Sequence, residues 1–409
     1  MGADMSKRRH NIKWETMIVL VAGLLAGTAA LAQEGGGDGG LQASVGLYFD
    51  LNDNLFNSND QAAESWASRL SPELLLSSAP GSRQLSVAYE GDYAKFFDSP
   101  DDDYEDHSLK GRGLFERGAK GLFEISAGFA QGHQARGSGS TQGVPPDSPL
   151  FPSEPDFFDR IDWSAEYTHG HREARGRLRF GIGEDSLKHT NNRDRTQYFD
   201  RNEILASAGL EIGLRERTAF VFEARYTDTI YDVDRPGQAS REGDSLMLLV
   251  GVTWEATAKT EGSVRFGSQR RSFDDPVRPA EKSATWDVDV RWLLREHSYF
   301  DFVAKRANTE TNAGGDFIDR SSYGVSWTHN WAFDLESVLR LDWQKDDYIG
   351  TRRKQDESKY YFGLRLPQGN RLIWDTGVSY RDRSTDNEIE TLEYEGFLYT
   401  IGVNLQLIR

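Results

Sequence analysis

The sequence predicts an all-β fold, a transmembrane up-and-down antiparallel β-barrel of about 18 strands with short periplasmic turns and long extracellular loops. Three observations lead to this prediction. Polar and apolar residues alternate along most of the chain, the connections between the alternating runs are short and long in turn, and aromatic residues are frequent at 12% although the formal net charge is -17. A mean hydropathy of -0.64 excludes a membrane protein built from helices.

The alternation is clear in QLSVAYEGDYAKF (84–96), where Leu85 and Val87 share one parity and Glu90 and Asp92 share the other. Successive side chains on a strand point to opposite faces, so this pattern predicts a strand with one apolar and one polar face. From Leu41 onward such runs recur with turn signals between them, and no helical period is sustained. We count about eighteen strands.

The connections between these runs alternate in length. Short ones include SAPGSR (78–83) and PQGN (367–370), and long ones include residues 135–156 and DDYIGTRRKQDES (346–358). This alternation is typical of an outer-membrane barrel, with tight turns on one side and long loops on the other. A soluble array of sandwich domains would repeat about every 100 residues, and no such boundary is present.

The N-terminus has the three parts of a secretory signal peptide. A basic segment (Lys7–Lys13) precedes an apolar one (Met17–Ala32), which ends in an A-x-A cleavage site. We therefore expect a cleaved signal peptide over 1–32, a Gly-rich lead over 33–40 and a single barrel domain over 41–409; the alternative is an N-terminal membrane anchor. Export to the bacterial outer membrane follows, and the acidic mature chain argues against nucleic-acid binding.

In a membrane barrel the apolar face of each strand meets lipid and the charged face lines a wet lumen. Charged residues can alternate with Trp286 and Trp292 on one strand only if their own face is solvated. This rule gives the following lumen-facing candidates: Glu90, Asp92, Arg175, Arg177, Arg179, Glu223, Arg225, Asp287, Asp289 and Arg291. The three arginines of 175–179 either line a path for an anionic solute or pair with carboxylates of adjacent strands, such as Glu166.

The last run, TIGVNLQL, resembles the C-terminal assembly signal of outer-membrane barrels, which the barrel-assembly machinery reads. The residues that match are a polar residue, a glycine and two alternating leucines: Thr400, Gly402, Leu405 and Leu407. Such chains commonly end in an aromatic residue, whereas this one ends in Arg409.

The N-terminal part carries a second resemblance. DNLFNSND (53–60), followed by hairpins with DYEDHSL (103–109) between them, resembles the β-barrel porin family associated with exopolysaccharide and capsule gene clusters. The resemblance covers nearly the whole mature chain. It implies an outer-membrane barrel that is a conduit for secreted polysaccharide.

Residues 135–156 form the longest connection and the third external loop. Four prolines, Pro145, Pro146, Pro149 and Pro152, stiffen it and Pro155 follows, and in general porins the third loop folds into the lumen. Asp147, Glu154 and Asp156 would then face the basic residues of 175–179 across a constriction. The alternative is a solvated surface loop, and the sequence leaves both open.

No motif indicates catalysis. The histidines are scattered without a nucleophile motif, and His169 and His171 share a face without a third ligand nearby. The acidic stretch 98–106 lacks the spacing of an EF-hand. We therefore expect no enzyme, no catalytic residue, no metal and no cofactor.

The sequence thus predicts a porin-like channel, a passive conduit for exopolysaccharide or other hydrophilic solutes. The alternative is a non-conducting structural or surface-binding barrel whose external loops contact polysaccharide or partners. Expected partners are outer-membrane lipid and lipopolysaccharide, and the barrel-assembly machinery during insertion. The sequence does not indicate an oligomeric state.

Overall fold

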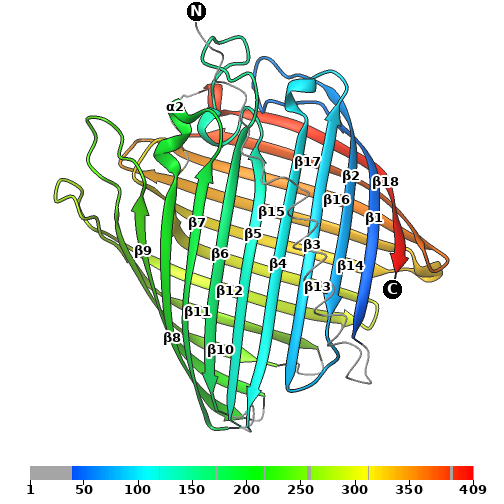
Figure 1. Ribbon diagram of the computed structural model, residues 1–409, viewed down its shortest axis with the longest axis vertical. Coiled ribbons are helices and arrows are strands. Elements are labelled where there is room, and N and C mark those ends of the chain that lie inside the picture. The colour runs from blue at the N-terminus through cyan, green and yellow to red at the C-terminus, as the bar shows by residue number, and fades with distance from the viewer. Residues whose placement is uncertain are drawn as a thin grey trace, which may run out of the picture.

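Eighteen antiparallel strands form one closed sheet in the computed structural model (Figure 1). Each strand pairs with its neighbours in the chain, and β1 pairs with β18 to close the ring. The structure describes residues 39–118, 120–170, 174–215, 217–255, 259–311, 313–386 and 390–408, so the predicted signal peptide lies outside the described residues. The predicted fold class, an up-and-down antiparallel barrel of 18 strands, is confirmed.

The strands are 12 to 15 residues long, enough to cross a bilayer at the tilt of a barrel strand. They are β1 (Gly40–Asn52), β2 (Ser65–Ser77), β3 (Arg83–Phe96), β4 (Tyr104–Arg117), β5 (Gly121–Gln134), β6 (Asp156–His169), β7 (Gly176–His189), β8 (Arg201–Arg215), β9 (Thr218–Tyr231), β10 (Gly243–Trp254), β11 (Thr260–Arg271), β12 (Glu281–Arg295), β13 (Ser298–Thr309), β14 (Phe317–Asn330), β15 (Glu336–Ile349), β16 (Lys354–Gln368), β17 (Leu372–Thr385) and β18 (Tyr394–Ile408).

Helical segments of the described residues are short and lie in the connections. They are η1 (Pro100–Asp102), η2 (Gly139–Thr141), α2 (Arg193–Thr196), η3 (Gln197–Phe199), η4 (Ala332–Asp334) and η5 (Glu390–Leu392). Within the described ranges, no helix has both the length and the apolar character needed to cross a membrane.

Short and long connections alternate, with one departure from the prediction. We number the long-loop connections 1 to 9, from loop 1 (53–64, between β1 and β2) to loop 9 (386–393, between β17 and β18). The long loop predicted at 346–358 is wrong, because β15 continues to Ile349 and β16 begins at Lys354, which leaves only 350–353 as loop 8. Asp346 and Glu357 pair with arginines of adjacent strands, so these polar residues line a strand face and do not interrupt it.

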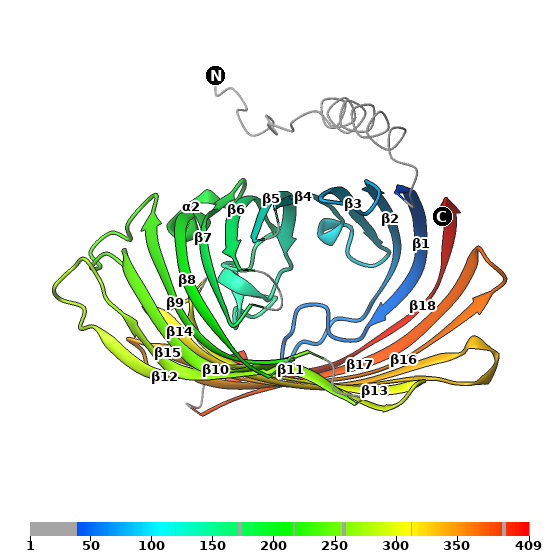
Figure 2. The same ribbon diagram turned by 90° about the horizontal axis from the view of Figure 1, so that it is seen from below.

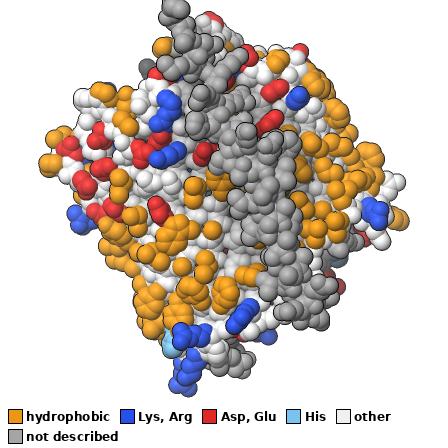
Figure 3. Space-filling model, in the orientation of Figure 1, with side chains coloured by type: hydrophobic (Ala, Val, Ile, Leu, Met, Phe, Trp, Pro, Cys, Tyr) orange, Lys and Arg blue, Asp and Glu red, His pale blue; other side chains and the backbone are white. Residues whose placement is uncertain are grey.

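The two faces of the wall differ in character. The exposed large apolar residues of a strand mostly share one parity, as Leu178, Phe180 and Ile182 do on β7, and this is the outer face. The charged residues of the other parity form ion pairs across strands inside the ring. On the face shown in Figure 3, apolar side chains cover the middle of the wall and charged ones gather toward the upper left, near the long-loop ends.

The seam between β1 and β18 depends on a glycine of the last strand. Tyr48 lies opposite Gly402, and a Cβ at Gly402 would come within 2.2 Å of Tyr48 Cδ1 and 2.5 Å of the Leu47 carbonyl oxygen. Thr400 donates to Asp50 across the same seam at 2.6 Å. Thr400 and Gly402 therefore face the lumen, whereas Leu405 and Leu407 are exposed on the outer face.

We expect Gly402→Ala to destabilise the barrel by about 1–3 kcal/mol, because the added methyl group overpacks a site bounded by backbone. The matched control is Gly209→Ala on β8, where the nearest atom to an added Cβ is 3.5 Å away. The measurement is urea unfolding of the folded protein in detergent, with heat-modifiable gel mobility as the folding check. Equal unfolding midpoints for the two variants would contradict the role of Gly402.

Candidate functional site

Loop 1 is held inside the ring by the DNLF segment. The backbone N–H of Asp53 donates to the carbonyl oxygen of Phe397 on β18 at 3.1 Å, and the backbone N–H of Phe397 donates to the Asp53 carboxylate at 2.6 Å. Asn54 is buried and its amide donates to the carbonyl oxygens of Ser58 and Glu395, both at 2.8 Å. Figure 2 shows loop 1, in blue, within the ring of strands. The segment fixes loop 1 to the seam, and its last residue, Phe56, packs against Phe151 of loop 3.

Loop 3 (135–155) leaves β5 through an arginine that is nearly enclosed. Arg136 forms an ion pair with Asp102 of η1, its Nε donating to Asp102 Oδ1 at 2.8 Å. Its guanidinium also lies over the rings of Phe56 and Phe151, at 4.8 and 5.6 Å. The hydrogen bonds to Asp102 raise the pKa of Arg136, so its guanidinium stays charged. One side chain thus joins loops 1, 2 and 3.

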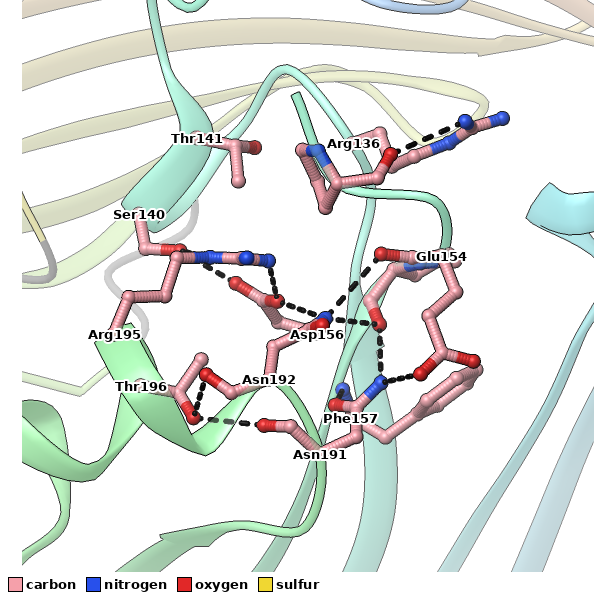
Figure 4. Close-up of polar contacts among 12 residues, drawn as sticks. Arg136, Ser140, Thr141, Glu154, Asp156, Phe157, Asn191, Asn192, Arg195 and Thr196 are labelled. Atoms are coloured by element: carbon pink, nitrogen blue, oxygen red, sulfur yellow. Dashed lines mark hydrogen bonds and ion pairs between the residues drawn. The ribbon is translucent and has the colours of Figure 1, made fainter. Parts of the chain in front are cut away.

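A second network joins loop 3 to loop 4 (190–200) at the start of β6 (Figure 4). Asp156 is 2% exposed and forms an ion pair with Arg195; it also accepts hydrogen bonds from Ser140 at 2.5 Å and Asn192 at 2.8 Å. Arg195 Nε donates to Ser140 Oγ at 3.1 Å, which brings η2 against loop 4. All oxygens of this buried carboxylate are satisfied, so the return of loop 3 to the wall is fixed.

Glu154 lies beside this network. It accepts a hydrogen bond from the Asn191 amide at 2.9 Å, and Asn191 in turn accepts one from the Phe157 backbone at 2.7 Å. Asp147, in contrast, is exposed and forms no hydrogen bond or ion pair within the part of the chain that the structure describes.

The middle of loop 3 touches the opposite wall. Gln142 accepts a hydrogen bond from Arg353 of loop 8 at 2.5 Å, and a Cβ at Gly143 would lie 2.5 Å from Leu392 of loop 9. Between β5 and β16 lie six strands on one side of the ring and ten on the other. Loop 3 therefore crosses the lumen as a chord, and Figure 2 shows its turquoise segment inside the ring.

The predicted constriction, in which loop 3 faces the arginines of 175–179, is wrong. Asp156 pairs with Arg195 of loop 4, while Arg177 and Arg179 pair with Glu211 of β8, and Arg179 lies 3.3 Å from Glu166. Arg175 is exposed in the short turn before β7. The reason is position along the strand, because residues 175–179 lie at the short-turn end and loop 3 enters from the long-loop end. Arg177 and Arg179 follow the other expectation for these arginines, because they pair with carboxylates of adjacent strands.

Three further lumen candidates meet in one network. Glu223 accepts from Arg225 and from Arg265, both at 2.6 Å, and Asp287 lies 3.4 and 3.1 Å from the same two arginines. Arg265 did not stand out in the sequence. It lies two residues before Gly267 on β11, so both residues point to the same face of the strand, toward the lumen. Two carboxylates and two guanidinium groups leave this part of the wall charged but balanced.

The remaining lumen candidates are less closely grouped. Arg291 donates to Asp301 at 2.6 Å, and Asp92 accepts from Ser71 at 2.7 Å and from Tyr104 at 3.0 Å. Glu90 and Asp289 are exposed; Glu90 lies 3.9 Å from Lys110, whereas no ion pair is given for Asp289 within the described ranges.

Loops 4, 5 and 7 are tied together by an arginine of loop 5 that the sequence analysis missed. Arg241 donates to the carbonyl oxygens of Tyr198 at 2.5 Å and Thr311 at 3.5 Å, and its guanidinium lies over the ring of Tyr231 at 4.2 Å. The pKa of Arg278 in loop 6 is lowered, first by the burial of Arg278 and then by the positive charge of Arg241. Only the fold brings these loops together, so no local sequence signal marks Arg241.

Loop 4 is held by a buried carboxylate. Asp200, 1% exposed, accepts hydrogen bonds from the backbone and ring of His189 at 2.8 and 2.9 Å, and it pairs with Arg193. Burial raises the pKa of Asp200, but the hydrogen bonds from His189 and Arg193 outweigh burial and hold the pKa below its ordinary value. The carboxylate is therefore charged at neutral pH.

The described residues contain no group of three or more His, Asp or Glu side chains placed to hold a metal ion. His169 bonds to the Tyr167 hydroxyl at 3.1 Å, and His171 lies outside the described residues.

The comparisons with known proteins agree with this architecture. The family model described as "Putative beta-barrel porin 2" matches residues 40–407. The chain belongs to this porin family. Porin families are typically non-enzymatic channels of the outer membrane, and this barrel has that form. The comparison with curated proteins gave no match.

Several solved structures are similar to the chain. They include a BenF-like porin from Pseudomonas fluorescens Pf-5 (11% identity, TM-score 0.48, 90% of this chain and 99% of that one). Pseudomonas aeruginosa OccK3 (OpdO) gives 13% identity, a TM-score of 0.47 and coverage of 94% and 99%. The FrpB iron transporter from Neisseria meningitidis has 10% sequence identity and a TM-score of 0.45, and the match covers 88% of this chain and 64% of that one.

Arg136→Ala should free the start of loop 3 from its attachment to Asp102. Asp102 would be left as a buried carboxylate without its partner, which costs about 3–5 kcal/mol locally. We expect faster cleavage within 135–155 by limited proteolysis of the folded barrel. The control is Arg112→Ala, which removes an exposed ion pair with Glu124 in the wall. Cleavage of loop 3 at the wild-type rate in Arg136→Ala would refute the anchor.

Asp200→Asn should lower the free energy of unfolding by about 1–3 kcal/mol at neutral pH, because charged hydrogen bonds are lost. The folded-state pKa of Asp200 is lowered, so its contribution is complete above the ordinary pKa of 3.8 and is lost as the pH falls below that value. Urea unfolding across this pH range should show the difference between variant and wild type shrinking in acid. A difference that is constant with pH would contradict this assignment.

Proposed function

We propose that the barrel is a passive channel for hydrophilic solutes and that loop 3 sets the size of what passes. The observation that carries the proposal is the chord formed by loop 3, which divides the long-loop half of the lumen into two sectors. A porin-family barrel with charged, hydrogen-bonding inner walls supports a water-filled path. The proposal includes no catalytic step.

The two sectors differ in which loops they hold, because loops 4, 5 and 7 meet at Arg241 on the side of β7–β14. Loops 1, 2 and 9 all contact loop 3 on the side of β17, β18 and β1–β5, through Phe56, Asp102 and Leu392. The sector between β6 and β16 is the larger one by strand number. We propose that solutes pass through this larger sector. Its wall carries the network of Glu223, Arg225, Arg265 and Asp287.

The charges of this wall favour a solute of low net charge. In the network of Glu223, each carboxylate has two arginine partners, and Arg177 and Arg179 share Glu211. A predominantly basic wall would be needed for a strongly anionic polymer. A neutral saccharide chain fits the balanced wall, and the resemblance to barrels associated with exopolysaccharide points to the same substrate class.

A second function is favoured by the same chord. Loop 3 is fixed at both ends and touches the far wall through Gln142, so a loop that fills the lumen would make a non-conducting barrel. The protein would then be structural, or would bind surface polysaccharide or partners through its external loops.

The experiment is single-channel recording of the refolded full-length mature protein in a planar bilayer. Wild type should give stable unitary steps that neutral oligosaccharides reduce. Arg136→Ala/Arg195→Ala, which releases both ends of loop 3, should give larger or noisier steps. The control is Arg112→Gln, whose exposed pair with Glu124 lies in the wall away from loop 3.

Each outcome decides between the two functions. Steps in wild type that sugars reduce support the channel. A silent wild type with a conducting double variant shows that loop 3 plugs the barrel and supports the structural role. Silence of both proteins, with folding confirmed by heat-modifiable mobility, would overturn the channel proposal.

A further inference from the structure

The outer face of the wall carries charged residues near the long-loop ends of its strands. Cations of this rim that lie next to a carboxylate form ion pairs. The distances are 3.2 Å for Lys188–Asp232, 2.7 Å for Arg306–Asp319, 3.2 Å for Lys345–Asp356 and 3.0 Å for Lys354–Asp347. These pairs are balanced in charge and exposed at the side of the barrel.

Two cations of the same rim differ from these. Arg270 is the next-to-last residue of β11, Lys282 is the second residue of β12, and the two lie directly opposite each other in the register. Both are exposed, and among the described residues neither has an ion pair. Lys95 of β3 also forms no ion pair with any described residue, but no second unpaired cation lies opposite it.

Like charges directly opposite each other on adjacent strands are destabilising. A shared anion between Arg270 and Lys282 would remove that cost, and the guanidinium and ammonium groups together provide donors for phosphate. Asp228 and Asp244, on the outer face of β9 and β10, oppose each other in the register and form no ion pair with either cation. Among the described residues, no carboxylate forms an ion pair with Arg270 or Lys282, although Asp244 lies one outer-face position beyond Leu246, the residue opposite Arg270.

The wall below these cations is suited to a lipid. Moving toward the middle of β11 and β12 on the outer face, the next opposed pair is small, Ser268 and Ala284. The pair after it is aromatic, Phe266 and Trp286, with Phe266 57% exposed. The small pair leaves room for a headgroup between the cations and the aromatic rings. Beside them on β10, Leu248 and Val250 are exposed to the same side.

We propose that Arg270 and Lys282 bind a phosphate of a glycolipid in the outer leaflet, the phosphorylated headgroup of lipopolysaccharide, with its acyl chains against the apolar wall of β10–β12. The charge complementarity and the sequence of cations, small residues and aromatic rings down one strip of wall carry this assignment. This lipid site lies on the outer face, so it does not depend on whether the lumen conducts.

The test uses the full folded protein in detergent with purified lipopolysaccharide, and with the same lipid after enzymatic removal of its phosphates. Retained lipid is counted by native mass spectrometry. Wild type should retain the phosphorylated lipid at least tenfold more tightly than the dephosphorylated one. The double variant Arg270→Gln/Lys282→Gln should lose that preference.

The matched control is Lys345→Gln/Lys354→Gln, which removes two cations of the same rim that have carboxylate partners. It should bind as wild type does. Equal loss in test and control variants would show a general charge effect and overturn the site, as would unchanged binding in the test variant. Displacement of the lipid by millimolar inorganic phosphate alone would show a simple anion site and overturn the lipid assignment.

Discussion

Closure of the ring is the constraint on which the rest of the structure depends. A strand in lipid has no water to satisfy its backbone, so an open sheet edge is excluded and β1 must pair with β18. That pairing joins the first strand of the barrel to the last one. The seam is made by Tyr48 against Gly402, and by Thr400 with Asp50. The same seam holds loop 1 through Asp53 and Asn54, so closing the wall also positions the first support of loop 3.

The long loops act as one assembly, because buried charges join loops that are distant in the chain. Arg136 connects loops 1, 2 and 3, and Asp156 with Arg195 connects loops 3 and 4. Gln142 and Arg353 carry the connection across the ring, between residues 211 positions apart. A buried ion pair fixes geometry better than it adds stability, since desolvation of both charges offsets much of their attraction. The path through the lumen is therefore defined by loops whose positions depend on one another.

The wall could be predicted from the sequence because alternation and connection length are local signals. Strand number, closure and the parity of Glu223 and Asp287 followed from them. Loop 8 was mispredicted, since Asp346 and Glu357 are as polar as loop residues and only their lumenal arginine partners show that they belong to strands. The partners of Asp156 could not be predicted, because pairing with Arg195 requires knowing which end of the barrel each group occupies. DNLF was visible in the sequence, but its contact with Glu395 was not.

The chord of loop 3 has a mechanical consequence. A large β-barrel is a thin shell, and lateral pressure in a bilayer can flatten its cross-section more easily than it can stretch the strands. A segment attached at β5, β6 and the opposite wall resists that deformation as a cross-brace does in a tube. Loop 3 meets the far side of the ring at two contacts, Gln142 with Arg353 and Gly143 with Leu392. The shape of the barrel in membranes of different thickness or tension would depend on these two contacts.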